Sequence, residues 1–191
     1  MFDERVRERL EVLDRVRREL AAPFEAFAAR VAALLRDGGK IYFFGNGGSA
    51  ADAQHIATEL IDRLTMRRDA IPALALTTNS SLITAVANDH GFEMVFARQV
   101  EAYARPGDVL VGITTSGRSE NVLRAFRTGR ALGTMNAAFT GARGLAEPAL
   151  ADHLLAVPSG DTQLIQEMHI ALGHLLCLAI EERLFGHSND E

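Results

Sequence analysis

The sequence predicts an α/β fold in which about five buried, parallel strands are flanked by helices. Short and continuous apolar runs, such as 41–44 and 109–113, alternate along the chain with amphipathic helical segments. Continuous apolar strands that alternate with helices are typical of a parallel sheet covered on both faces. The sequence has no low-complexity linker, so its 191 residues are expected to form one domain.

The N-terminal segment, residues 1–36, is expected to be helical. Apolar residues recur every three or four positions from Val6 to Leu20, with charged residues between them. Pro23 is expected to end this first helix, and a second amphipathic helix is expected to follow it and to stop at Asp37-Gly38-Gly39. The first helix either packs on its own core or provides a contact between subunits.

The sheet core is expected over residues 40–160, and one long helix is expected over residues 162–185. That helix is apolar on nearly all sides, so we expect it to be buried, partly against another subunit. The five predicted strands are 41–44, 73–76, 109–113, 137–139 and 154–157, and helices are predicted after the first three, the third of them over 120–132.

Composition and charge narrow the class of protein. Twenty Lys and Arg against 25 Asp and Glu give a net charge of -5, which argues against nucleic acid as the main partner. The single cysteine, Cys177, cannot form an internal disulfide, which suits a reducing cytosol, and a buried thiol is expected there. The first residues lack the apolar region of a secretory signal, and the longest apolar stretch is too short to span a bilayer. We therefore expect a cytoplasmic protein without a membrane partner.

The loop after the first predicted strand is rich in glycine. Gly45-Asn46-Gly47-Gly48-Ser49-Ala50 fits the dinucleotide-binding pattern G-x-G-x-x-A. That pattern also requires an acid near the end of the next strand, where this sequence has Thr77-Thr78-Asn79. The sequence also has no G-x-x-x-x-G-K-[ST] pattern, so neither a dinucleotide nor a nucleoside triphosphate is expected.

A second loop, Thr114 to Ser119, directly precedes a predicted helix, as the glycine loop does. Helix N-termini offer unpaired N–H groups and a positive dipole end, both of which suit a phosphate. Ser49, Ser116 and Ser119 provide further O–H donors. Ordinary caps and turns are the alternative interpretation, but two such loops in corresponding places favour a sugar ligand with a single phosphate.

Polar residues share one face of the helix that follows the glycine loop. Asp52, His55, Glu59 and Arg63 are spaced by three, four and four positions, which aligns them on that face. His55 and Glu59 are one turn apart and could bind zinc, although such a pair is more often a surface ion pair.

The long C-terminal helix carries Gln166, His169 and His174 among apolar residues. A core histidine with a hydrogen-bond partner is the common interpretation of His174. Gln166 and His174 are eight residues apart, roughly 12 Å along a helix, which is too far for two ligands of one ion. Either the start of the helix is irregular, or one of the two residues serves a site completed by a neighbouring chain. The second is our hypothesis.

Five motifs are similar to those of a known family: 45–55, 87–89 with 91–92, 105–110, 115–117, and Thr162 with 165–167. On these motifs the sequence resembles the phosphoheptose isomerases, members of the sugar isomerase (SIS) fold, from about Phe27 to Phe185. The chain departs from the family pattern beside the site, at Asn79, Arg118 and Glu120.

The resemblance implies a single SIS domain over 1–191, with a three-layer fold, and a homotetramer with sites at subunit interfaces. It implies one zinc per subunit, bound by His55, Glu59, Gln166 and His174, with Glu59 and His174 as the catalytic acid and base. The implied substrate-binding residues are Asn46, Gly47, Gly48, Ser49, Glu59, Asn88, Asp89, Thr114, Thr115, Ser116, Ser119 and Gln166.

The activity that the resemblance implies is aldose–ketose isomerisation of D-sedoheptulose 7-phosphate to D-glycero-D-manno-heptose 7-phosphate, for heptose nucleotide precursors. One alternative is a non-catalytic SIS binding module, either a sugar-phosphate sensor or a replication-initiator-associating protein. The other is an isomerase of a different sugar phosphate. A non-enzyme has no reason to keep all four implied metal ligands together, and their presence favours the enzyme.

Overall fold

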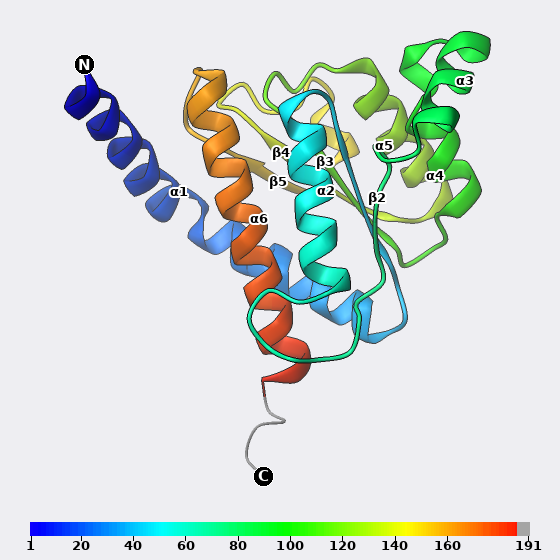
Figure 1. Cartoon of the computed structure of the whole chain (residues 1–191), viewed down its shortest axis with the longest axis horizontal. Coiled ribbons are helices and arrows are strands. Elements are labelled where there is room, and N and C mark those ends of the chain that lie inside the picture. Colours follow the sequence, from blue (N-terminus) through cyan, green and yellow to red (C-terminus); the bar gives the residue numbers. More distant parts are fainter. Residues whose placement is uncertain (187–191) are drawn as a thin grey trace.

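The computed structural model describes residues 1–186, which form a helix-covered sheet (Figure 1). Its elements are, in chain order, α1 (Phe2–Arg36), β1 (Ile41–Gly45), α2 (Gly48–Ile61), β2 (Ala73–Ala75), α3 (Ser80–His90), the 3-10 helix η1 (Phe92–Met94), α4 (Ala97–Tyr103), β3 (Val109–Thr114), α5 (Glu120–Leu132), β4 (Met135–Thr140), the 3-10 helix η2 (Pro148–Leu150), β5 (His153–Ala156) and α6 (Thr162–Phe185).

The sheet has five parallel strands in the order β2-β1-β3-β4-β5, which confirms the predicted fold class. Alternate residues of the strands face opposite layers. Phe43 and Phe139 pack with α1, α2 and α6, whereas Phe44 and Leu110 pack with α4 and α5. Because both faces are covered, the central strands are apolar at every position rather than at every second one.

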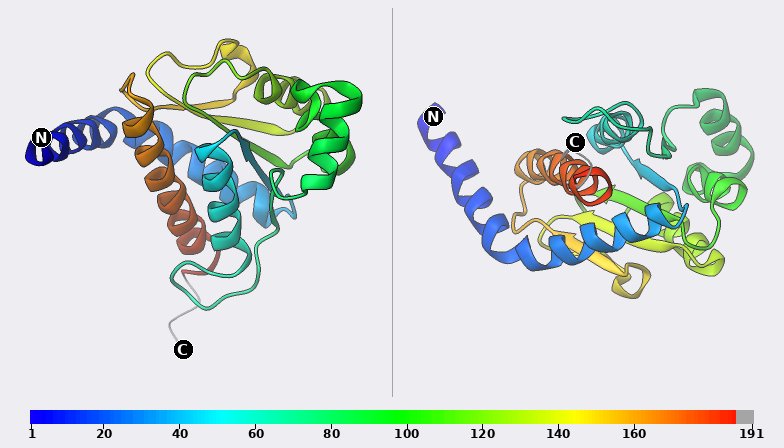
Figure 2. Two further views of the ribbon diagram at one scale, coloured as in Figure 1. Left: turned by 45° about the horizontal axis from the view of Figure 1, so that its top comes forward. Right: turned by 90° about the horizontal axis from the view of Figure 1, so that it is seen from below.

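The predicted break at Pro23 is wrong, because α1 is one helix of 35 residues with Pro23 inside it. Proline removes one helical hydrogen bond and usually kinks or breaks a helix. Here the helix bends and continues (Figure 2). Leu20 before the proline and Phe24 after it are both buried in the same core, so a continuous helix keeps apolar burial that a break would lose.

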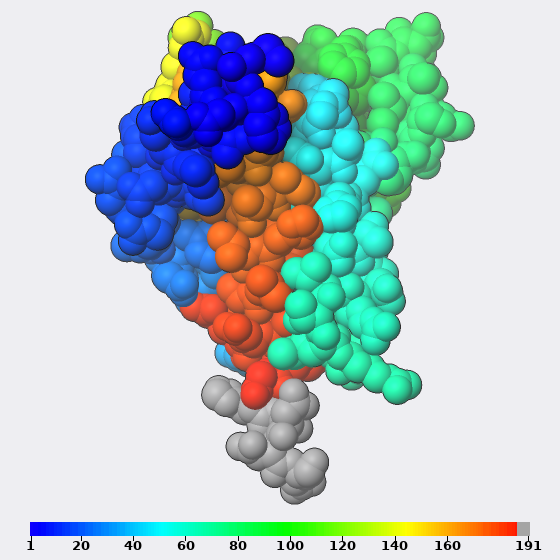
Figure 3. Space-filling view, turned by 60° about the vertical axis from the view of Figure 1, so that its left-hand side comes forward, coloured from blue at the N-terminus to red at the C-terminus, as the bar shows by residue number. Residues whose placement is uncertain are grey.

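Helix α6 packs against α1 and α2. It is long and apolar enough to cross a membrane, but half of its most apolar window is buried inside the protein. Core helices of soluble proteins commonly share this property, so it is weak evidence for a membrane span. A strip of α6 remains uncovered between α1 and α2 (Figure 3). Cys177 on this helix is a buried free thiol, as predicted, and burial raises its pKa to about 12.

Candidate functional site

Two histidines and a glutamate meet between α2 and α6. His55 Nε2 lies 2.8 Å from His174 Nε2 and 3.4 Å from Glu59 Oε1. The ligand atoms of the three side chains all lie within 4.8 Å of one another. We call these three residues the helix cluster. All three are candidate site residues on the sequence pattern, and the structure places them together within one chain.

The packing of α2 on α6 brings the helix cluster together. His55 and Glu59 are one turn apart on α2, so they share a face. On the opposing helix, Gly173 precedes His174, and a Cβ atom at Gly173 would lie 2.6 Å from Cγ1 of Ile56. Since Ile56 follows His55, the absence of a side chain at Gly173 lets the two helices approach at the level of the histidines.

The helix cluster fits a metal ion. Two imidazole nitrogens and a carboxylate form a common donor set of catalytic zinc, which leaves a fourth position open. The side chain of His55 is 49% exposed and that of Glu59 is 20% exposed, so a ligand can reach the cluster from solvent. The same groups also lie at the distances over which acids and bases exchange protons. Among residues 1–186, this is the one group of at least three His, Cys, Asp or Glu side chains with such close ligand atoms.

Asp52 lies one turn before His55 and shares its face of α2. Its Oδ2 atom is buried and has no hydrogen-bond partner in the structure. Burial raises the pKa of Asp52, and the nearby His55 opposes that rise. A partly buried carboxylate beside the helix cluster is suited to orient an imidazole.

Gln166, the fourth predicted metal ligand, lies near the start of α6 and reaches the glycine loop. Helix α6 is α-helical from Thr162 onward, which excludes the alternative of an irregular helix start. The side chain of Gln166 instead lies beside Gly48 of the same chain, where a Cβ atom would be 2.7 Å from Gln166 Nε2. Gly48 therefore makes room for the amide, and Gln166 lies at the glycine loop.

The glycine loop (residues 45–50) and the loop of residues 114–119, which we call the serine loop, lie side by side because β1 and β3 are neighbouring strands. Together we call them the loop cradle. Gly47 and Gly117 have φ values of 60° and 67°, which favour glycine. The loops are joined by two hydrogen bonds between the side-chain amides of Asn46 and Asn121, at 2.9 and 2.8 Å. The amide of Asn46, predicted to bind substrate, is thus engaged with Asn121, a residue that the sequence analysis missed.

Hydroxyl groups gather at the serine loop. Thr114 Oγ1 lies 3.2 Å from Ser119 Oγ, and Ser116 Oγ accepts a hydrogen bond from the N–H of Arg118. A cavity of about 160 Å³ adjoins the loop. Besides the predicted Thr115 and Ser116, the cavity is lined by Gly141, Ala142, Arg143, Ser159, Gly160, Thr162 and Ile165.

Two predicted substrate-binding residues lie on α3, away from the helix cluster. Asn88 and Asp89 are exposed on α3, where Asn88 Nδ2 donates a 2.8 Å hydrogen bond to Asp89 Oδ1. Figure 1 shows α3 at the edge of the molecule, on the far side of α2 from α6. Within one chain, the structure does not bring them to the helix cluster.

The core histidine of α6 is His169 rather than His174. His169 is fully buried, and its Nε2 lies 3.0 Å from the carbonyl oxygen of Thr140. Burial lowers its pKa to about 4, and the bond to Thr140 opposes this only in part. His174 instead stands half-buried in the helix cluster.

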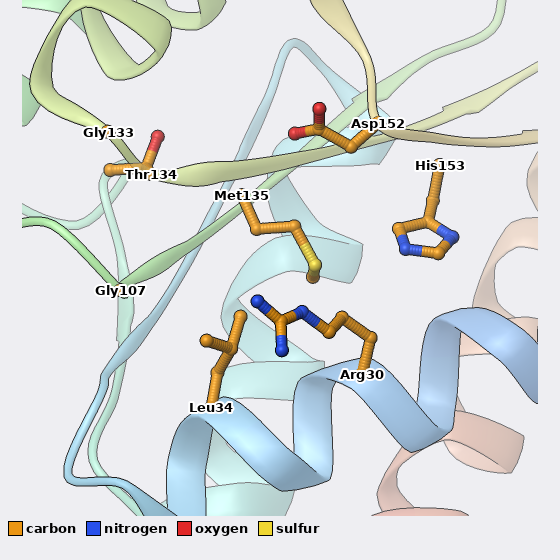
Figure 4. A pocket seen from close by; sticks show the side chains of 8 residues that line it. All are labelled: Arg30, Leu34, Gly107, Gly133, Thr134, Met135, Asp152 and His153. Carbon is orange, nitrogen blue, oxygen red and sulfur yellow. The ribbon is translucent and has the colours of Figure 1, made fainter.

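A larger cavity, of about 570 Å³, lies at the opposite edge of the sheet (Figure 4). Gly107 and Gly133, which precede β3 and β4, line it together with Arg30 of α1 and His153 of β5. It contains none of the predicted site residues, so the loop cradle and the helix cluster remain the candidate site.

The parallel five-stranded sheet, the hydroxyl-rich loops at its carboxyl edge and the flanking helices define a sugar isomerase domain. Consistent with this, the family model of the SIS domain matches residues 6–141. A phosphoheptose isomerase from Aquifex aeolicus is 54% identical over 81% of each chain. One from Paramagnetospirillum magneticum is 50% identical over 94% of each chain.

A solved structure gives the same result. A phosphoheptose isomerase from Francisella tularensis superposes with a TM-score of 0.92 at 35% identity, over 95% of this chain and 96% of that one. The chain therefore belongs to the phosphoheptose isomerase family of SIS domain proteins, and it is an enzyme, a sugar phosphate isomerase.

Proposed function

We propose that the enzyme converts D-sedoheptulose 7-phosphate into D-glycero-D-manno-heptose 7-phosphate, for the synthesis of heptose nucleotide precursors. The observation that carries this proposal is the helix cluster, which gathers a carboxylate and two imidazoles in an accessible place. The names of the similar proteins support the substrate class.

The reaction moves one proton between C1 and C2 of the sugar through an enediol. Glu59 takes the carbon-bound proton and returns it to the neighbouring carbon. His174 moves the proton between the two oxygens, so that no atom is gained or lost. A carboxylate and an imidazole suit these two roles near neutral pH.

The donor set supports a zinc ion held by His55, Glu59 and His174, with Gln166 as the fourth ligand implied by the family resemblance. A bound zinc would polarise the sugar carbonyl and stabilise the enediolate charge. In this proposal His55 serves mainly as a ligand, with Asp52 orienting its ring.

The loop cradle holds the far end of the sugar. Ser49, Thr115, Ser116 and Ser119 line or flank the two loops, and the N-termini of α2 and α5 add their dipoles. Binding energy from the remote phosphate then positions the reacting carbons at the helix cluster.

The enzyme works, in this proposal, as a cytoplasmic homotetramer with its sites at subunit interfaces. Leu10 and Leu13 on α1 and Leu175 on α6 are large apolar side chains with 58%, 47% and 49% exposure, which a partner would cover. Asn88 and Asp89, distant from the helix cluster within one chain, would contribute to the site of a neighbouring subunit.

The test is an assay of the purified protein with sedoheptulose 7-phosphate, before and after treatment with a chelator and again after zinc is restored. We expect a heptose 7-phosphate as product, loss of turnover with the chelator, and recovery with zinc. No turnover with zinc restored would contradict the proposed substrate, and other ketose phosphates would then be assayed in the same way.

A further inference from the structure

A buried ion pair lies beyond the helix cluster, where the segment 62–72 crosses the end of α6 (Figure 1). Arg68 Nε donates to Glu181 Oε1 at 3.0 Å, and the two side chains are 1% and 0% exposed. Neither residue belongs to the loop cradle or to the helix cluster.

The carboxylate of Glu181 attaches this segment to α6. It accepts hydrogen bonds from the N–H groups of Leu64 and Thr65 at 3.0 and 3.1 Å, and from the hydroxyl of Thr65 at 2.8 Å. Burial alone would raise the pKa of Glu181, but these donors outweigh it and lower the pKa. Glu181 therefore stays charged at neutral pH.

The guanidinium of Arg68 attaches the same segment, 62–72, to α2. Its Nη2 donates to the carbonyl oxygen of Glu59 at 2.9 Å, and its Nη1 donates to that of Leu60 at 2.9 Å. One of its bonds therefore goes to the backbone of a residue of the helix cluster. These carbonyls are at the C-terminal end of α2, where a cation is favoured.

The geometry relates the ion pair to the helix cluster. Glu181 follows His174 by seven residues, or about two helical turns, so both lie on one face of α6. Helices α2 and α6 are thus joined at two levels, at His55 and His174 and again at Arg68 and Glu181. Fixing the second level limits how far α6 can slide or tilt relative to α2 at the first.

We propose that Arg68 and Glu181 are positioning residues that set the separation of Glu59 and His174 for isomerisation. The inference rests on the proposed function for its kinetic part. Buried ion pairs are often no more stabilising than apolar side chains of similar volume, so stability alone is a weak reason for charges here. Misplacement of reacting groups by about 1 Å can lower a rate by orders of magnitude.

The decisive variant replaces both charges at once. Arg68→Met with Glu181→Leu leaves no lone buried charge, but it leaves the N–H groups of Leu64 and Thr65 and the carbonyls of Glu59 and Leu60 without these partners. We therefore expect a lower melting temperature, and the kinetics are compared at a temperature at which the variant stays folded. We expect kcat to fall about tenfold, with KM changed less than about twofold. Zinc affinity, measured by competition with a chromophoric chelator, is expected to fall by about the same factor. If the role of the ion pair is purely structural, the folded double variant keeps wild-type kcat and zinc affinity. That result would overturn the proposal.

The control removes a more exposed ion pair of α6. Arg183 Nη2 bonds Glu25 of α1 at 2.6 Å, two residues beyond Glu181, and we expect Arg183→Met with Glu25→Leu to leave kcat and zinc affinity unchanged. Crystal structures of the wild type and the Arg68–Glu181 double variant add a readout independent of activity, the distance between the Glu59 carboxylate and His174 Nε2. An unchanged distance would overturn the proposal even if the substrate assignment fails. An altered distance in an enzyme inactive on sedoheptulose 7-phosphate would contradict only the proposed function. If the double variant does not fold, Glu181→Gln is measured in the same way.

Discussion

The loop cradle and the helix cluster are built by different means. Each loop of the cradle is one continuous segment between a strand and a helix, and the Asn46–Asn121 pair joins the two loops directly. The helix cluster joins residues 119 positions apart and depends on how closely α6 approaches α2. We therefore expect changes in the cradle to alter substrate binding, and changes at the α2–α6 interface to alter turnover.

The largest effect is expected at the helix cluster itself. Glu59→Gln keeps the size of the side chain but removes the base, so kcat should fall by about 10²–10⁴-fold while KM changes little. Steady-state kinetics with sedoheptulose 7-phosphate measure both constants. Glu182→Gln, at an exposed position of α6, is the control that should keep wild-type kinetics. Near-normal turnover of Glu59→Gln would show that the helix cluster does not carry out the proton transfer.

Gly173→Ala tests the interface without touching an ionisable group. The new methyl group would meet Ile56, so α6 must move away from α2 or Ile56 must shift. We expect kcat to fall about 10- to 100-fold and the free energy of unfolding to fall by about 1–3 kcal/mol.

The second change Ile56→Ala makes room for that methyl group and should restore most of the lost turnover of Gly173→Ala. Chemical denaturation measures the stability of both variants beside the kinetics. A fall in stability with unchanged kcat would show that the helix cluster tolerates movement of α6.

Asn121→Ala tests the loop cradle. It removes one partner of the amide pair and leaves the side chain of Asn46 without its bonds, at a cost of about 1–3 kcal/mol. Because the pair fixes the cradle and not the helix cluster, KM should rise about tenfold while kcat stays within about twofold. Saturation curves distinguish the two constants, and a fall in kcat at constant KM would contradict the division of roles.

The smallest effect concerns stability in mild acid. The folded pKa of His169 is about 4, below its ordinary value of 6.5, so between these values the unfolded chain binds a proton that the folded chain does not. Stability is therefore fully present above pH 6.5 and falls as the pH drops toward 4. His169 should lower the free energy of unfolding by about 1 kcal/mol between pH 7 and pH 5.5.

Denaturation curves at the two pH values measure this change, and His169→Gln, which can still donate to Thr140, should remove most of it. The same pH dependence in His169→Gln would assign it to other groups. Since His169 lies outside both the cradle and the helix cluster, the variant should keep wild-type kinetics at pH 7.

Much of this site was predictable because its signals are local. The apolar runs identified the strands, the glycine and serine loops followed them, and His55 and Glu59 were aligned by their spacing on one helix. The three-layer fold follows from the same pattern, since strands that are apolar at every position need cover on both faces.

The contacts between distant segments were decided only by the tertiary structure. Which histidine of α6 is buried and which joins His55 depends on the rotation of α6 against the sheet, and both His169 and His174 stand in apolar surroundings in the sequence. The continuation of α1 through Pro23, the Asn46–Asn121 pair and the Arg68–Glu181 pair have the same origin. Local patterns report the propensity of a segment, whereas these features were settled by apolar burial and hydrogen bonding among segments that meet only once the chain has folded.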